Sequence, residues 1–256
     1  MLNQCVKHGA SAPAAPRCKP PFSLRASYCA GVRKLVSCLS TCIFPDATTY
    51  PIDEGMIHNG PPHASNEGYS YAKRMLEVQS RLYRSAHGLD AVCIVPTNVY
   101  GAHDNFSLQH SHVIPGLLHK CLLAQRDGTP FVVAGSGAPR RQFIYAPDLA
   151  RLTLAVLRRY SEAGPLILAP DAADEVSIAD VAAGVAAAMR FDGRLAFDAQ
   201  RADGQLRKTA ANGKLRALLA AGELGEELRG FAFTPLKQGL EETAAWLRDQ
   251  YPNVRA

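Results

Sequence analysis

The apolar residues of this chain fall into short runs that alternate with longer amphipathic stretches. Two runs, 34–39 and 89–96, are apolar almost throughout over the length of a strand, and Pro96 marks the end of the second. Such runs are typical of strands that are buried on both faces of a parallel sheet. Two further runs, 130–135 and 164–170, also predict strands.

Stretches of helical length and composition separate these strands. The sequence predicts helices over 69–88, 113–128, 147–160, 178–190 and 236–250. Gly88 is a plausible end for the first. Ser177 and Asp180 have capping-box spacing before the fourth, and Thr234 with Pro235 forms an N-cap and N1 pair before the last. Strands that alternate with helices favour an α/β fold with a parallel sheet.

Composition and charge narrow the class of protein. Apolar residues make up 47% and charged residues 20% of the 256 residues, so we expect a folded core, and no apolar run is long enough to span a membrane. The net charge of +5 comes from residues 1–45, which hold six cations and no acid. The rest carries 22 cations against 23 acids, so we expect no nucleic-acid partner and no membrane partner.

The cysteines and the first residues bear on the compartment. The seven cysteines are odd in number and form no CxxC pair, which argues against a disulfide framework or a metal site and favours the reducing cytoplasm. Residues 1–30 are rich in Ala, Pro and Ser and lack acids. We expect them to be irregular, with ordered structure beginning at Gly31; an organelle transit segment is the alternative.

A tyrosine and a lysine four residues apart suggest chemistry. Tyr69 and Lys73 would share one helix face, beside the end of the strand at 34–39. The ammonium is expected to lower the pKa of the phenol, which can then give a proton to a carbonyl oxygen that Ser40 or Thr41 holds. The pattern alone is weak, because a half-buried Tyr beside a solvated Lys is the ordinary outcome. In context it predicts reduction of a ketone with a nicotinamide.

That context resembles a known family. Segments 35–75, 95–106, 111–120 and 135–145, beginning "LVSCLSTC", "VPTNVYG", "SHVIPG" and "GSGAPRR", look like GDP-L-fucose synthases, a branch of the extended short-chain dehydrogenases. The likeness runs from about Gly31 to the last helix. It implies an NADPH-dependent enzyme that epimerises C3 and C5 of GDP-4-keto-6-deoxy-D-mannose and reduces C4. It also implies a homodimer.

The resemblance assigns roles to individual residues. Ser40, Tyr69 and Lys73 match the reductase triad, and Cys42 and His112 match the acid/base pair of the epimerisation. Inverting a carbon next to a ketone needs one group that removes a proton and another that adds one on the opposite face, and a thiol and an imidazole suit both tasks near neutral pH. Without the resemblance, a buried hydrophobic Cys and an ordinary loop His would be the better interpretation.

The family's binding residues also have counterparts here. The resemblance implies that the cofactor contacts are Ser40, Thr41, Tyr69, Lys73, Pro96, Thr97, Asn98, Val99 and His112. It implies that the substrate contacts are Asn98, Lys120, Arg141, Asp203 and Lys208. Arginines such as Arg141 are suited to a diphosphate. Lys120 and Ala134 stand where some relatives have Arg and Trp.

The resemblance also implies how the chain is divided. It implies a truncated Rossmann-like parallel sheet over 31–165, with 103–134 contributing to the substrate side, and a smaller C-terminal α/β substrate-binding domain over 166–256. The family's Gly-rich phosphate turn has no counterpart, because the "GSG" at 135–137 is incomplete and reads as an ordinary turn. We therefore expect this chain to bind NADPH poorly.

Two alternatives to a working GDP-L-fucose synthase remain at this point. The chain can be an inactive fragment that binds a sugar nucleotide, or a partner for another subunit. It can also be another sugar-nucleotide epimerase or dehydratase. Cys42 with His112 argues against this last class, because simple 4-epimerases need no second acid/base pair.

Overall fold

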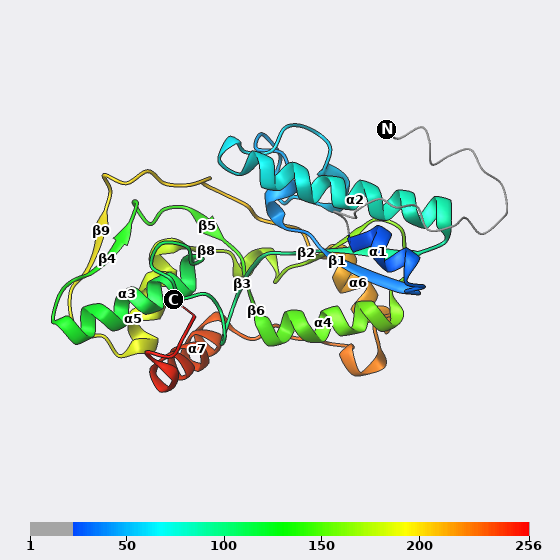
Figure 1. Ribbon diagram of the computed structural model, residues 1–256. Coiled ribbons are helices and arrows are strands. Elements are labelled where there is room, and N and C mark those ends of the chain that lie inside the picture. The colour runs from blue at the N-terminus through cyan, green and yellow to red at the C-terminus, as the bar shows by residue number, and fades with distance from the viewer. Residues whose placement is uncertain (1–22, 256) are drawn as a thin grey trace.

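A three-stranded parallel sheet forms the centre of one part of the molecule. The computed structural model describes residues 23–255, and the sheet has the order β1-β2-β7. Its strands are β1 (Lys34–Cys38), β2 (Asp90–Pro96) and β7 (Pro165–Leu168). Helix α2 (Glu67–His87) packs on one side, and α4 (Ala146–Arg159) and α6 (Gly213–Ala221) pack on the other (Figure 1). The α/β fold and all four predicted strands are confirmed.

The apolar sequence of β2, the middle strand, is explained by the packing on both of its faces. Val92 and Ile94 belong to the cluster that includes the buried leucines of α4 and α6. Cys93 and Val95 alternate with them and pack with the loop residues Leu39 and Ile43 on the other face. Because side chains of a strand alternate between faces, a strand covered on both sides must be apolar at every position.

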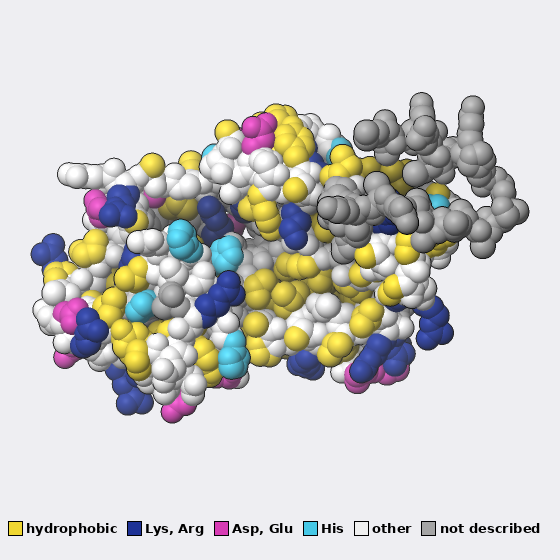
Figure 2. Space-filling model, viewed as in Figure 1, with side chains coloured by type: hydrophobic (Ala, Val, Ile, Leu, Met, Phe, Trp, Pro, Cys, Tyr) yellow, Lys and Arg dark blue, Asp and Glu magenta, His cyan; other side chains and the backbone are white. Residues whose placement is uncertain are grey.

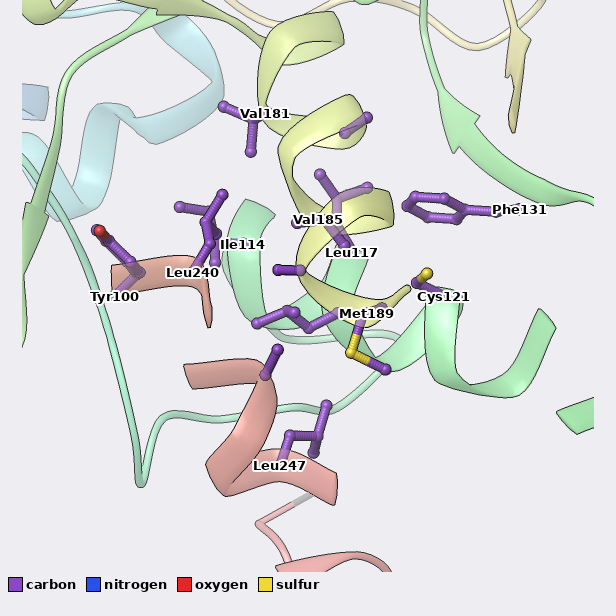
Figure 3. Close-up of a cluster of buried hydrophobic side chains, with 14 of the residues drawn as sticks. Tyr100, Ile114, Leu117, Cys121, Phe131, Val181, Val185, Met189, Leu240 and Leu247 are labelled. Carbon is purple, nitrogen blue, oxygen red and sulfur yellow. The ribbon is translucent and has the colours of Figure 1, made fainter. Parts of the chain in front are cut away.

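A second part is built around three helices. Helices α3 (Val113–Asp127), α5 (Ile178–Met189) and α7 (Leu236–Gln250) converge on one apolar core, which also includes Phe131. Figure 3 shows side chains of α5 meeting those of α3 and α7 in this core. Strand β4 (Phe131–Ala134), which pairs in parallel with β9 (Leu195–Asp198), flanks it. None of the helices between residues 23 and 255 is both long and apolar enough to cross a bilayer.

Short elements connect the two parts. The parallel pair β3 (Asn98–Tyr100) and β6 (Phe143–Tyr145) follows the sheet, and β5 (Arg140–Arg141) pairs antiparallel with β8 (Val176–Ser177). The sequence predicts none of these pairs, and it misses α6 and β9. Between residues 23 and 255 there are also five one-turn helices: η1 (Thr41–Ile43), η2 (Glu54–Met56), η3 (Ala64–Asn66), η4 (Ala172–Asp174) and η5 (Glu226–Leu228).

Helix ends confirm two predictions and correct two. Gly88 ends α2 in the left-handed region, and Ser177 with Asp180 forms a complete capping box for α5. Thr234 does not cap α7: Pro235 is the N-cap, and the Thr234 N–H donates to a carboxylate oxygen of Asp148 at 2.7 Å. The prediction that order begins at Gly31 is also wrong, because a helix, α1 (Ser23–Cys29), precedes it. The rest of the 1–30 prediction lies outside the described residues.

Asp90 joins three segments where the sheet begins. Its carboxylate lies 2.6 Å from Arg84 Nη1 and 3.4 Å from Lys34 Nζ, and it accepts a hydrogen bond from Ser161 Oγ at 2.8 Å. Burial alone would raise the pKa of Asp90, but the Ser161, Arg84 and Lys34 contacts outweigh burial and lower it.

A lowered pKa makes the contribution of Asp90 to stability depend on pH. That contribution is present above the unfolded-state pKa, about 4, and is lost as the pH falls through the lower folded-state pKa. We expect the urea midpoint to fall as the pH drops below about 4, and to fall less in Asp90→Asn. Urea titrations of both proteins at several pH values measure this. An equal fall in both would show that Asp90 does not carry the effect.

Candidate active site

A single turn after β1 carries three of the predicted site residues, Ser40, Thr41 and Cys42. The Leu39 N–H donates to the Ile94 carbonyl oxygen at 2.8 Å, which keeps the chain beside β2 until the turn begins. Ser40 is the N-cap of η1, and its Oγ accepts a hydrogen bond from the Cys42 N–H at 3.3 Å. Ser40 and Cys42 therefore lie together at the carboxyl ends of parallel strands, where ligands bind in open α/β sheets.

Helix α2 holds this turn from both sides. Lys73 Nζ donates to the Cys38 carbonyl oxygen at 2.7 Å, just before the turn. Arg74 Nε donates to the Ile43 carbonyl oxygen at 2.6 Å, just after it. Tyr69, one helical turn earlier, has its ring centre 5.7 Å from Lys73 Nζ. The spacing of Tyr69 and Lys73 thus brings both residues to the Ser40–Cys42 turn, as expected.

The pKa of Tyr69 shifts in the direction opposite to the prediction. Burial raises the pKa of Tyr69, and the thiolate forms of the nearby Cys42 and Cys38 act in the same direction. A hydrogen bond with Ser40 lowers that pKa, but by less than burial raises it. The predicted direction of the shift is therefore wrong, because burial decides it. Tyr69 is therefore protonated at neutral pH, with a proton to donate, and its side chain is half exposed.

Cations surround the Cys42 thiol. Lys208 Nζ lies 3.4 Å from Cys42 Sγ, although 166 positions separate the two residues in the sequence. Arg141 also lies close: burial lowers the pKa of Arg141, while the thiolate form of Cys42 acts in the opposite direction. Positive charge beside a sulfur atom stabilises its anion. The sequence places Lys208 among the sugar-nucleotide contacts; in the structure its ammonium lies at the thiol.

A cavity of about 310 Å³ has Arg141, the cation near Cys42, in its wall, whereas Ser40, Cys42 and Tyr69 are not among its lining residues. It is lined by the start of α3, by β4, by the 137–141 turn and by the 202–204 loop. Its lining contains five positions that the sequence analysis names: His112, Lys120, Ala134, Arg141 and Asp203. Figure 2 shows histidine and basic side chains near the middle of this face of the molecule. Such a cavity, with basic groups at its wall, suits a phosphorylated ligand.

Asp203 is already engaged within the protein. Its carboxylate accepts hydrogen bonds from the Ser136 N–H at 2.9 Å and from Ser136 Oγ at 2.6 Å. Gly135, next to Ser136, has φ +87°, and a Cβ there would lie only 2.4 Å from the Asp203 carboxylate. The "GSG" turn therefore holds the 202–204 loop over the cavity, which confirms that it is an ordinary turn and adds a structural role.

The "PTNV" segment follows β2 at the same edge of the sheet. Pro96 ends β2, as predicted, and Asn98 Nδ2 donates to the Gln142 carbonyl oxygen at 2.9 Å. Thr97 is buried, and its Oγ1 has no hydrogen-bond partner within residues 23–255. An unpaired buried hydroxyl at this edge of the sheet fits a polar ligand such as a nicotinamide.

Three residues that support the site escape the sequence analysis. Arg74 anchors the Ser40–Cys42 turn, as described above. Gln142 is 1% exposed, and its Oε1 accepts from the Ala210 N–H at 2.8 Å while its Nε2 donates to the Pro170 carbonyl oxygen at 2.9 Å. Glu175 is buried among arginines. Only Arg74 could have been connected with the site from the sequence, because it directly follows Lys73. Gln142 and Glu175 form long-range contacts that no local sequence pattern indicates.

Comparison with known proteins bears on the family of this chain. Residues 24–168 match the NAD dependent epimerase/dehydratase family. A GDP-L-fucose synthase from Dictyostelium discoideum is 51% identical over 224 residues, which are 88% of this chain and 67% of that protein. A probable GDP-L-fucose synthase from Drosophila melanogaster is 45% identical over 91% of this chain and 72% of its own length.

A solved structure shows similarity to the same kind of protein. The crystal structure of a GDP-L-fucose synthetase from Naegleria fowleri bound to NADP aligns with a TM-score of 0.84 and 43% identity. The alignment covers 91% of this chain and 71% of that one. These matches confirm the expected Rossmann-like fold and the expected family, and they favour the synthase over the two alternatives. The chain belongs to the NAD dependent epimerase/dehydratase family and, within it, to the GDP-L-fucose synthases.

Proposed function

We propose that this protein makes GDP-L-fucose from GDP-4-keto-6-deoxy-D-mannose, by epimerising C3 and C5 and then reducing the C4 ketone with NADPH. The observation that carries the proposal is the shared turn at the end of β1. Ser40 of the reductase triad and the Cys42 thiol lie two residues apart, Lys73 of α2 is bonded to the residue before that turn, and Lys208 contacts the sulfur. Groups for both chemical steps thus meet in one place.

Epimerisation requires proton transfers at two carbons next to the ketone. A base removes the proton from C3 or C5, the electron pair moves onto the ketone oxygen as an enolate, and an acid then protonates the same carbon on the opposite face. Cys42 and His112 are the proposed pair for these transfers. His112 lies at the cavity wall, where a sugar ring attached to a bound nucleotide can reach it. Lys208 and Arg141 offset the negative charge that forms on the sulfur.

Reduction uses the hydroxyl groups at the start of α2 and the end of β1. When bound, NADPH supplies a hydride to C4. Tyr69 gives its proton to the C4 oxygen, which becomes a hydroxyl group, and Ser40 hydrogen-bonds to that oxygen. Lys73 keeps the turn in place through the Cys38 carbonyl. Thr97 and Asn98 lie at the carboxyl end of β2, where the nicotinamide side of the cofactor is proposed to bind.

The cavity suits the nucleotide of the substrate. Arg141 and Lys120 supply positive charge for the diphosphate, and the 202–204 loop that Asp203 holds closes one side. We propose that residues 31–165 bind the nicotinamide side of the cofactor, while residues 166–256, together with 103–134, bind the GDP-sugar.

Deuterium exchange tests the proposed function directly. The protein is incubated with GDP-4-keto-6-deoxy-D-mannose in D₂O without NADPH, and NMR follows the C3 and C5 protons. We expect deuterium at both carbons, and GDP-L-fucose with loss of NADPH absorbance once NADPH is added at a concentration high enough to offset its expected poor binding. A substrate that keeps both protons over the time in which a related synthase exchanges them would contradict the proposal.

We also propose a homodimer that forms through α2. Tyr71, Met75 and Leu82 are 46%, 51% and 45% exposed and, with Val78 between them, follow the spacing of one helix face. An exposed apolar stripe of this kind is typical of an interface between protein chains.

The five described cysteines are free, which supports the proposed cytoplasmic location.

The dimer proposal predicts the effect of one charge. Met75→Glu places a carboxylate in the middle of the stripe, where a partner chain would bury it without a counter-ion. We expect sedimentation to show a dimer for the wild type and a monomer for Met75→Glu, while Arg81→Glu, outside the stripe, stays dimeric. A monomeric wild type would refute the dimer, and a dimeric Met75→Glu would place the interface elsewhere.

A further inference from the structure

Glu175 is a buried carboxylate for which the mechanism above has no use. It lies between η4 and β8, outside the cavity lining, and its side chain is only 4% exposed. Burying a carboxylate is unfavourable unless cations and hydrogen-bond donors surround it. The groups that pair with the Glu175 carboxylate therefore indicate which segments of the chain it holds in place.

Those partners come from two segments that reach the active site. Arg140 Nε lies 3.1 Å from the Glu175 carboxylate, and Arg140 Nη2 donates to the Glu175 carbonyl oxygen at 2.8 Å. Arg207 Nε lies 3.3 Å from the carboxylate, and Thr209 Oγ1 donates a short hydrogen bond to it. Arg207 Nε also donates to Thr209 Oγ1 at 2.7 Å, so the three side chains form one network.

Arg207 and Thr209 are the two neighbours of Lys208 in the chain. In an extended segment, alternate side chains point to opposite sides. Arg207 and Thr209 both contact Glu175, while Lys208 contacts Cys42 Sγ at 3.4 Å. The Glu175 network thus holds one side of this segment, and the lysine extends from the other side toward the thiol.

Backbone contacts around the segment are independent of the Glu175 carboxylate. Leu206 O accepts from the Arg140 N–H at 2.8 Å, Thr209 O accepts from the Ile52 N–H at 2.8 Å, and Ala210 is bonded to Gln142. These bonds fix the ends of the segment, and between them Tyr50 Oη donates to the Arg207 carbonyl oxygen at 2.8 Å. The Glu175 network adds side-chain contacts on either side of Lys208 to these backbone contacts.

Glu175 is ionised at neutral pH. Burial alone would raise the pKa of Glu175, but hydrogen bonds from Thr209, Arg140 and Arg207 outweigh burial and lower it. The network therefore holds a full negative charge with two arginines, each about half exposed, at 50% and 49%.

We propose that Glu175 is a positioning residue of the epimerisation: by holding Arg207 and Thr209, it keeps the Lys208 ammonium against the Cys42 thiol. This inference rests on the proposed function, because it takes Cys42 as a proton-transfer group. It assigns Glu175 no contact with the substrate. Its effect reaches the reacting carbons only through Lys208.

Three variants test this assignment by deuterium exchange without NADPH. Glu175→Gln keeps the shape and a hydrogen-bond acceptor for Thr209 but removes the charge, and its half-exposed arginines can turn to water. We expect exchange to slow by about tenfold or more, with the Kd for GDP within about threefold of wild type. Lys208→Met should slow exchange similarly, and the double variant should exchange within about threefold of Lys208→Met alone.

The double variant separates positioning from a general structural role. If Glu175 acts through Lys208, the two effects are not additive; multiplied effects, or wild-type exchange in Glu175→Gln, would overturn the proposal. Arg207→Met removes one of the two arginines that pair with Glu175, at a half-exposed position, and it should also slow exchange. This variant tests the proposal if Glu175→Gln does not fold. Asp90→Asn, an arginine-paired acid where the sheet begins, should exchange at the wild-type rate. A wild type that does not exchange at all would refute the proposed function instead.

Discussion

Tyr69→Phe should slow NADPH-dependent reduction by about 10²–10⁴-fold, the usual contribution of a general acid, while epimerisation continues. The substitution removes one hydroxyl and keeps the ring, which stays beside Lys73 at 5.7 Å. The lost hydroxyl is the proposed proton donor for the C4 oxygen, and it is a hydrogen-bond partner of Ser40. Cys42 and His112 are the proposed pair for C3 and C5, so their proton transfers should not need it.

Two measurements on one sample separate the steps. Loss of NADPH absorbance in a single turnover reports reduction, and deuterium at C3 and C5 without NADPH reports epimerisation. Tyr71→Phe is the matched control, because Tyr71 is also half exposed on α2 but lies near Arg74, 5.5 Å from its ring centre. We expect Tyr71→Phe to keep both rates. If Tyr69→Phe lost exchange together with reduction, the division of roles would be wrong.

The fold could be predicted where a local pattern determines it. Strand β2 is apolar at successive positions because both of its faces are covered, and Gly88 and Ser177 end and begin helices through their own backbone and side chain. Strands β5 and β8 are two residues long and exist because Arg140 and Arg141 lie opposite Ser177 and Val176. No short-range pattern encodes such a pair.

In the candidate site, too, some contacts follow from local spacing in the sequence and others do not. Tyr69 and Lys73 share a helix face, and Ser40 with Cys42 shares a turn, so their spacing in the sequence already places them together. The contact between Lys208 and Cys42 and the network around Glu175 depend on how the two parts of the molecule pack. The same holds for the pKa of Tyr69: the sequence shows the lysine, but burial, which it does not show, decides the direction.

Cys42→Ser should reduce deuterium exchange at C3 or C5 by about 10²–10⁴-fold and leave the Kd for GDP nearly unchanged. A serine hydroxyl is of similar size but is far too weak an acid to replace a thiol that transfers protons. The side chain lies in a turn whose backbone is held by Ser40 and Arg74, so the substitution leaves the turn intact. Arg141 and Lys120, the proposed nucleotide contacts in the cavity wall, are unchanged by the substitution.

Cys38→Ser provides the matched control, four residues earlier in the chain. Burial raises the pKa of Cys38, so that this thiol remains protonated, and its Sγ donates only to the Leu39 carbonyl oxygen at 3.6 Å. We expect Cys38→Ser to exchange and reduce like the wild type. Calorimetry with GDP and NMR in D₂O measure both variants under identical conditions. Near-normal exchange in Cys42→Ser would mean that the sulfur only fills space beside Lys208, because a catalyst of proton transfer cannot lose its ionisable group without slowing the step it catalyses.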